Sequence, residues 1–437
     1  MCGRGGTGRV PLATVPGPVT AVSGAHPAPQ GFDSSSPSTA RLPRRFQVSK
    51  EVLLVAGTRP EAVKIAPVAI ALRGHPGLRP TIVHSGQHSG MVEQAFRAFD
   101  LVPDVRLDAP RHTGTQAELV SRLLPEFDAV LEERDPAVTL VQGDTTTALA
   151  AALASFWRGI PVAHLEAGLR TGDLYGPFPE EGNRQMISRI TSLHLAPTDD
   201  AANVLNTESL PDSHIVVTGN TVVDAVQRVA SADLAASSPD LVALERTLDA
   251  TGGRLMLVTV HRRESWGRPL MRVLNAVRSI ADRHPDLHVL IPAHPNPGVR
   301  EQVVSLLGGH ERVVITDPLD YPDLVRVLRR AALVLTDSGG IQEEAPTFGV
   351  PVLVLRETTE RMLAVDAGCA WLVGTDTTRI LAEAGWVLGS RLRLPLGRNP
   401  FGDGRAAVRV CSALERLAGL PTALPRREPF ATLAGVW

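Results

Sequence analysis

The sequence predicts a parallel α/β protein of two domains, and three observations support this. The chain has 437 residues, more than the size at which a single hydrophobic core stops growing. From Glu51 onward, short apolar runs alternate with turns and helical segments, a pattern typical of parallel sheets with crossover helices. One strand pattern ends near residues 218–221, where a polar, alanine-rich helical stretch leads to a new series of strands. We therefore place the domain boundary there.

The remaining segments follow from composition. Residues 1–47 are dominated by Gly, Pro, Ser, Ala and Thr without periodicity, so they bury too little apolar surface to offset their ordering entropy. We expect this segment to be disordered, or to result from an upstream start site. The predicted parts are therefore an extension over 1–47, domains over 48–218 and 219–403, a helix over 404–418 that packs back on the first domain, and a tail over 419–437.

Eight apolar runs are the clearest candidates for buried strands. They cover residues 51–56, 81–84, 138–142, 161–166, 255–260, 288–292, 333–337 and 352–355. The helix after the first run has a recognisable start, because Thr58 and Glu61 have the spacing of a capping box and Pro60 stands in the first turn, where a missing N–H is harmless. This helix carries Lys64.

Composition excludes several classes of function. The net charge is −2 and the apolar share is 43%, so the chain has no general attraction to nucleic acid or to anionic membranes. No apolar run approaches the length of a membrane span, and the N-terminus lacks the apolar core of a signal peptide. Cys2, Cys369 and Cys411 lie far apart, as expected of reduced thiols. We expect a cytoplasmic protein that binds neither nucleic acid nor membrane.

Polar residues collect where predicted strands end, which is the ligand-binding edge of an open α/β sheet. They are Arg59, Gln87, His88, Asp144 and Glu166 in the first half, and His261, His294, Asp337 and Ser338 in the second. Two such edges facing each other would form one cleft. The sequence therefore predicts an interdomain site for an anionic ligand.

Three carboxylates suit the inversion of a carbon, which needs proton removal on one face and proton delivery on the other. Asp144 has an alternative role as cap of the helix over 145–157. Glu166 closes an apolar strand, so it must meet water, a cation or a substrate. Glu180 has an alternative role in the first turn of a helix, where the dipole favours an acid.

A turn over residues 336–344 joins a strand to a helix through Gly339 and Gly340. Its free N–H groups suit a diphosphate, although a tight turn capped by Ser338 is an equal alternative. Arg361 and His261 could supply further donors to the same anion, although arginines after a strand are more often solvated.

Other chemistries lack their residues. His88, His164 and His294 do not have paired metal-ligand spacing, so we expect no metal and assign His294 a structural or phosphate-contacting role. No glycine-rich GxGxxG follows the first strand. Neither Tyr175 nor Tyr321 has a lysine four residues on, so the Tyr-x-x-x-Lys pair of short-chain NAD-dependent epimerases is absent. We expect no nicotinamide and no other cofactor.

The chain resembles the bacterial non-hydrolysing UDP-N-acetylglucosamine 2-epimerases over about residues 50–418. The motifs that carry the resemblance are GTRPEAVKIAP, QGDTTTALAAALA, HLEAGLRTGDLYGPFPEEGNRQ, VTGNTVVDA, VTVHRRES, PAHPNP, TDSGGIQEEAPTFGVPVLVLRETTER and NPFGDG, in this order. It implies two Rossmann-like domains of the glycosyltransferase-B type, a UDP-sugar in the interdomain cleft, a homodimer, and a role in cell-surface polysaccharide biosynthesis.

The resemblance also implies roles for individual residues. Asp144, Glu166 and Glu180 match the family's catalytic carboxylates, and His261 would sit beside the leaving diphosphate. The substrate-binding set consists of Arg59 and Lys64 beside the diphosphate and sugar, Ser338, Gly339 and Gly340 at the phosphates, Glu344 at the ribose hydroxyls, and Arg361 at the nucleotide phosphates. The implied reaction interconverts UDP-GlcNAc and UDP-ManNAc, or a related UDP-hexosamine, through elimination of UDP and a glycal intermediate.

The chain departs from the family pattern at three places. Met362 and Leu363 stand where Pro-Glu is usual, and residues 89–91 and 113–116 differ in regions that the family uses for a second, activating UDP-sugar. We therefore expect weakened or absent substrate activation. A hydrolysing 2-epimerase and a glycosyltransferase of the same fold are the alternative enzymes, and a nucleotide-sugar sensor without turnover is the non-enzymatic alternative.

Overall fold

The computed structural model describes residues 49–87, 89–109, 113–208, 210, 214–262, 265–396 and 399–419. The disorder predicted for residues 1–47 and the tail beyond Gly419 lie outside these residues. His88, named above among the strand-end residues, also lies outside them.

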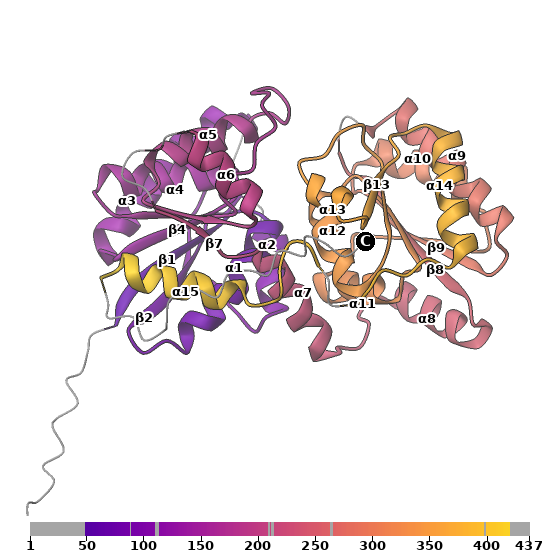
Figure 1. The fold of residues 1–437 in the computed structure, drawn as a ribbon, viewed down its shortest axis with the longest axis horizontal. Helices are drawn as coiled ribbons and strands as arrows, with labels where there is room; N and C mark the ends of the chain where they lie inside the picture. The colour runs from indigo at the N-terminus through magenta and orange to yellow at the C-terminus, as the bar shows by residue number, and fades with distance from the viewer. Residues whose placement is uncertain are drawn as a thin grey trace, which may run out of the picture. The chain divides into compact units, whose positions relative to one another are not determined.

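The first half of the described chain forms a seven-stranded parallel sheet in the order β3-β2-β1-β4-β5-β6-β7, with helices on its faces (Figure 1). Its strands are β1 (Lys50–Ala56), β2 (Leu78–His84), β3 (Val105–Arg106), β4 (Val138–Gln142), β5 (Val162–Leu165), β6 (Leu193–Ala196) and β7 (His214–Val217). Its helices are α1 (Arg59–Arg73), α2 (Ser89–Arg97), α3 (Gln116–Arg134), α4 (Thr146–Trp157), α5 (Glu180–Ile190) and α6 (Asp199–Thr207).

The second half forms a six-stranded parallel sheet in the order β10-β9-β8-β11-β12-β13. Its strands are β8 (Arg254–Thr259), β9 (Leu287–Pro292), β10 (Val313–Thr316), β11 (Leu333–Thr336), β12 (Val352–Val354) and β13 (Ala370–Leu372). The helical segments are α8 (Pro239–Thr251), α9 (Arg268–Arg283), α10 (Pro297–Leu307), α11 (Tyr321–Arg330), α12 (Gly339–Glu344), the 3-10 turn η2 (Ala345–Phe348), α13 (Met362–Asp366) and α14 (Thr377–Ser390).

Strand β1 shows why both faces of a sheet need helices. Val52 and Leu54 pack into one core cluster, whereas Leu53 and Val55 pack into another, as the two-residue period of a strand requires. A strand buried on both faces reads as a continuous apolar run. Helix α1 begins as expected, since the capping box of Thr58 and Glu61 is formed.

Both sheets have a Rossmann-like order. Each begins with a central strand, β1 or β8, builds outward to one side and then restarts on the other side with β4 or β11. Ligands bind outside the carboxyl ends of the strands at this switch point. The predicted fold class, two Rossmann-like α/β sheets, is therefore confirmed, while the exact domain limits stay a prediction.

The chain passes between the sheets twice, and the two passages meet. Helix α7 (Thr221–Ala232) follows the first passage and α15 (Ala406–Leu417) follows the second. The Asn220 N–H donates to the Phe401 carbonyl oxygen over 2.8 Å, and the Asp224 carboxylate accepts the N–H groups of Ala406 and Ala407. Helix α15 contacts α1, α7 and β6 (Figure 1).

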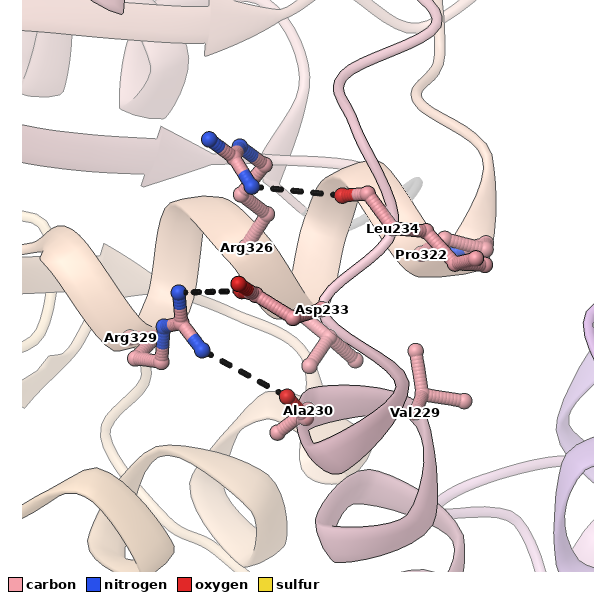
Figure 2. A pocket seen from close by; sticks show the side chains of 8 residues that line it. Val229, Ala230, Asp233, Leu234, Pro322, Arg326 and Arg329 are labelled. Atoms are coloured by element: carbon pink, nitrogen blue, oxygen red, sulfur yellow. Dashed lines mark hydrogen bonds and ion pairs between the residues drawn. The ribbon is translucent and has the colours of Figure 1, made fainter.

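Figure 2 shows a small pocket between α7 and α11. Its two arginines hold the end of α7, because Arg326 donates to the Leu234 carbonyl over 3.2 Å and Arg329 pairs with Asp233 over 2.7 Å. The cavity of about 10 Å³ holds no more than one water molecule. It is therefore too small for a nucleotide sugar.

Candidate active site

The polar residues predicted at strand ends lie where expected. Arg59 comes shortly after β1, Asp144 after β4 and Glu166 directly after β5, while His261 and Ser338 come shortly after β8 and β11. These are the carboxyl ends of the strands beside the two switch points. The contacts of their side chains then decide which of them act together.

Glu166 stands in an unusual backbone conformation. Its φ is +66°, in the left-handed region, which costs a side-chain-bearing residue energy. The other non-glycine residues with positive φ in the described part of the chain, Asp100, Asp135, Asp233 and Arg391, all follow helices, where such a turn is common. Glu166 instead leaves a buried strand, so its carboxylate is held in place at an energetic cost.

The Glu166 side chain is buried among cations. One carboxylate oxygen lies 2.6 Å from Lys64 Nζ and also accepts the Gln142 side-chain N–H, and the other lies 3.4 Å from an Arg361 nitrogen. The Glu166 side chain is only 6% exposed. Because Lys64 and Glu166 come from the first half of the chain and Arg361 from the second, this carboxylate joins both sheets.

Glu343 completes the cluster. Its carboxylate lies 2.9 Å from Lys64 Nζ and 3.0 Å from Arg361 Nε. We call Lys64, Glu166, Glu343 and Arg361 the ion cluster. Burial would lower the pKa of Lys64, but Glu166 and Glu343 outweigh it and raise that pKa above its ordinary value. The pKa of Arg361 is likewise raised, since its carboxylate neighbours outweigh its burial.

Asp144 does not cap the helix that follows it, so that alternative is wrong. Thr145 is the cap, and its hydroxyl accepts the Ala148 N–H. The Asp144 carboxylate pairs with Arg184 over 2.8 Å, and Arg184 also pairs with the fully buried Glu181 over 2.9 Å. Burial raises the pKa of Asp144 although Arg184 opposes the shift. Asp144 is therefore a partly exposed carboxylate that a buried pair holds in position.

Glu180 is the first residue of α5 and is partly exposed. It lies close enough for its charge to help raise the pKa of Asp144. The two carboxylates thus share one region, although the first-turn position that the helix dipole favours is also observed. The charges of Arg361 and Lys64 also act on Asp144, so Asp144 lies near the ion cluster, and Glu180 is linked to that cluster only through Asp144.

His261 and the turn after β11 form the cationic side of the site. His261 Nδ1 lies 3.0 Å from a carboxylate oxygen of the buried Asp337, which also accepts the His261 and Arg262 backbone N–H groups. Burial opposes ionisation of Asp337, but its bond to His261 lowers its pKa. The His261 side chain itself is 49% exposed and so remains open to a ligand.

The turn that follows brings Arg361 against the start of α12. Ser338 stands at the cap position, but its side chain makes no capping bond, so the predicted capping alternative is wrong. A Cβ atom on Gly339 would lie 2.9 Å from the Arg361 guanidinium carbon. A side chain at this position would therefore displace the arginine from its present place beside the turn. Gly340 follows in the same first turn of α12.

Arg59 and Glu344 lie close enough to influence each other's pKa. Arg59 donates to the Leu319 carbonyl over 2.8 Å and lies over the Tyr321 ring, 6.0 Å from its centre. Burial lowers the pKa of Arg59, and Glu344 opposes this. Burial also raises the pKa of Glu344 to about 7, against the influence of Arg59.

His294 follows β9 and has two contacts with residues on its own side of the site. Its Nδ1 accepts the Asn296 N–H over 3.0 Å, and its ring packs against Trp266 with centres 5.5 Å apart. These contacts support the structural role that was one of its two predicted alternatives. Its contact with phosphate stays a prediction.

Several partners of the site were not predicted. Gln142 ends β4, Glu343 directly precedes Glu344, and Arg184 lies one helical turn beyond Glu180. These partners are distinguished by their burial, because the side chains of Glu343 and Arg184 are only 1% and 3% exposed. Charged residues are rarely buried unless paired, but burial is visible only in the structure.

The described residues contain no group of three or more His, Cys, Asp or Glu side chains arranged to bind a metal ion. Nor do these residues include a helix with the length and hydropathy of a membrane span.

The fold and the site define an α/β enzyme class with a glycine-containing strand-to-helix turn and buried acids at the carboxyl ends of two sheets. Residues 70–415 match the family model described as UDP-N-acetylglucosamine 2-epimerase. A UDP-N-acetylglucosamine 2-epimerase of Yersinia pestis is 44% identical over 371 residues, which cover 84% of this chain and 98% of that protein. The chain belongs to the UDP-N-acetylglucosamine 2-epimerase family.

Solved structures agree. The UDP-GlcNAc 2-epimerase of Neisseria meningitidis, bound to UDP-GlcNAc, is 37% identical with a TM-score of 0.76, and the match covers 84% of this chain and all of that one (100%). That of Methanocaldococcus jannaschii, in complex with UDP-GlcNAc and UDP, is 31% identical with a TM-score of 0.71, over 84% of this chain and 99% of that one. The predicted family is therefore confirmed.

Proposed function

We propose that this chain interconverts UDP-GlcNAc and UDP-ManNAc by elimination and re-addition of UDP. The observation that carries the proposal is the ion cluster. In it the buried carboxylate of Glu166 lies beside the guanidinium of Arg361, and that guanidinium also lies next to Gly339, the first residue of α12. Proton removal and anion stabilisation are the two tasks of the reaction, and here their groups are in contact. The relative from Neisseria meningitidis binds UDP-GlcNAc.

The cationic side supports departure of the diphosphate. Carbon C2 of an N-acetylhexosamine is acidic only while the C1–O bond breaks, so stabilisation of the leaving group must accompany proton removal. Arg361, His261, the Ser338 hydroxyl and the N–H groups of Gly339 and Gly340 would hold the departing anion. The Ser338 N–H already donates to the Thr336 hydroxyl over 2.9 Å. Arg59 and Lys64 would border it, and Glu344 would accept the ribose hydroxyls.

The acids support the proton transfers. One carboxylate takes the C2 proton while the C1–O electrons leave with UDP, which gives a C1–C2 double bond. A second acid then protonates C2 from the opposite face as the diphosphate oxygen adds back to C1. Glu166, Asp144 and Glu180 are the groups we propose for these steps. Closure of the site must exclude water, because hydroxide would otherwise replace UDP.

Incubation with UDP-GlcNAc in D₂O, followed by NMR, tests the function. We expect deuterium at C2 in both UDP-GlcNAc and a newly formed UDP-ManNAc. A hydrolysing 2-epimerase would release UDP and the free 2-epimer, whereas a glycosyltransferase would leave C2 protonated. A sensor would bind UDP without turnover, so unchanged substrate with intact UDP binding would contradict the proposal.

Weakened or absent substrate activation is a separate expectation. Residues in or beside the altered segments are bound to the start of α4, since Thr147 donates to Gln87 over 2.8 Å and Thr146 donates to Gln116 over 2.7 Å. We expect initial rates to rise with UDP-GlcNAc concentration along a hyperbolic curve. A strongly sigmoidal curve would count against this expectation.

We also propose a homodimer that uses α4 and α5. Phe156 and Trp157 on α4 and Met186 on the adjoining α5 are 52%, 65% and 50% exposed, and exposed large apolar side chains that gather on neighbouring helices mark interaction surfaces. We expect Trp157→Lys to shift the mass found by light scattering from two chains to one. Trp386→Lys, at a similarly exposed tryptophan on α14, is the control and should leave the mass unchanged.

The cytoplasmic location and the polysaccharide pathway stay predictions.

A further inference from the structure

The basic residues of this chain are almost all arginines. Of the 44 Lys and Arg residues, Lys50 and Lys64 are the two lysines. Lys64 nevertheless stands in the ion cluster, where an arginine could also form ion pairs. The two side chains differ because a buried lysine changes its pKa readily, whereas arginine stays charged. A lysine at this position thus points to a cation whose charge depends on its surroundings.

The surroundings of Lys64 come from both halves of the chain. Its Nζ lies between Glu166 at the end of β5, 2.6 Å away, and Glu343 on α12, 2.9 Å away. Arg361 is the nearby like charge, and it contacts both carboxylates. Asp144 and Glu344 feel the charge of Lys64 from farther away.

Glu343 is the member of the ion cluster without an assigned task. Its side chain is 1% exposed, so it is more deeply buried than its partners. It contacts both cations of the cluster, one from each half of the chain. A buried charge that pairs with two cations fixes both of their positions, because leaving either one unpaired is costly.

We propose that Glu343 is a positioning residue that holds Lys64 and Arg361 against Glu166 and keeps Lys64 charged. The proposal rests on the proposed function, in which Glu166 handles the C2 proton and Arg361 binds the diphosphate. The contact between Lys64 on α1 and Glu343 on α12 then brings Glu166, which handles the proton, together with Arg361, which binds the diphosphate. Glu343 itself does not touch the reacting atoms.

The pH dependence of activity follows from these contacts. Two carboxylates raise the pKa of Lys64 against its burial. Neutralising Glu343 removes one of them, so the pKa of Lys64 falls and the amine loses its proton at a lower pH. The alkaline limb of the kcat/KM profile should therefore move to lower pH in Glu343→Gln.

The kinetic experiment compares three variants with the unaltered full-length chain. We expect Glu343→Gln to lower kcat/KM roughly 100-fold, as misplacement of reacting groups does, with the alkaline limb displaced. Glu343→Asp should recover the position of the limb, because it keeps the charge. Glu360→Gln is the matched control. The Glu360 side chain is also buried and lies 3.4 Å from Arg361, but it does not pair with Lys64. The alkaline limb of the kcat/KM profile should therefore stay in place in this variant. An unmoved limb in Glu343→Gln would overturn the proposal.

A second measurement separates this proposal from the proposed function. The ¹³Cε signals of the two lysines can be titrated by NMR, with Lys50→Arg to assign them. We expect the Lys64 signal to titrate at lower pH in Glu343→Gln than in the unaltered chain. If the unaltered chain fails to exchange C2 hydrogen, the function is wrong, yet this titration still decides the role of Glu343. Identical Lys64 titrations in Glu343→Gln and the unaltered protein would refute the proposed role of Glu343.

Discussion

Glu166→Gln should lower kcat for epimerisation by about 10²–10⁴-fold, the contribution of a positioned general acid or base. The amide cannot take a proton from C2, but it keeps the shape of the Glu166 side chain, which is only 6% exposed. Binding of UDP should change little, because the proposed phosphate donors remain. Initial rates and calorimetric titration with UDP measure the two effects separately.

Glu415→Gln is the matched control for this variant. Glu415 is also a buried glutamate, 8% exposed, but it lies on α15 beside His75. Its replacement should leave kcat within a small factor of the original value. Thermal melting of both variants checks that they fold. Near-normal turnover of Glu166→Gln would remove this residue from the proton-transfer step.

Arg361→Lys should reduce kcat by roughly 10²–10³-fold, the loss seen when one donor to a developing anion is removed. Lysine keeps the positive charge, but it lacks the planar guanidinium with which Arg361 can contact Glu166, Glu343 and a phosphate at once. UDP should also bind more weakly, because the guanidinium packs against Gly339 at the start of α12.

Arg356→Lys provides the comparison for this change. Arg356 pairs with Glu360 over 2.8 Å, the same acid that lies near Arg361. Among the described residues it forms no ion pair with a member of the ion cluster. It should retain most of the activity and of the UDP affinity. If both arginine variants behaved alike, the proposed phosphate role of Arg361 would be wrong.

The fold was largely predictable, because long buried strands of a parallel sheet appear as continuous apolar runs. The eight predicted runs correspond to β1, β2, β4, β5, β8, β9, β11 and β12. The five other strands have two to four residues each, such as Val105–Arg106 in β3. Length alone does not explain the difference, because the predicted strands β5, β11 and β12 have only three or four residues. Four of the missed strands, β3, β7, β10 and β13, are also less buried than these.

The site was predictable in its backbone positions but less so in its side-chain partners. Strand ends located Asp144, Glu166 and His261 because the carboxyl edge of a parallel sheet is a fixed place in the fold. The contact between Glu166 and Arg361 joins residues 195 positions apart, and no local spacing indicates it. The same holds for Glu343, whose importance follows from burial between two cations.

The bond between Asn220 and Phe401 has a mechanical consequence. The two stretches of chain that connect the sheets are fastened to each other here, and again where the Asp224 carboxylate accepts the Ala406 and Ala407 N–H groups. Neither stretch can therefore move independently of the other.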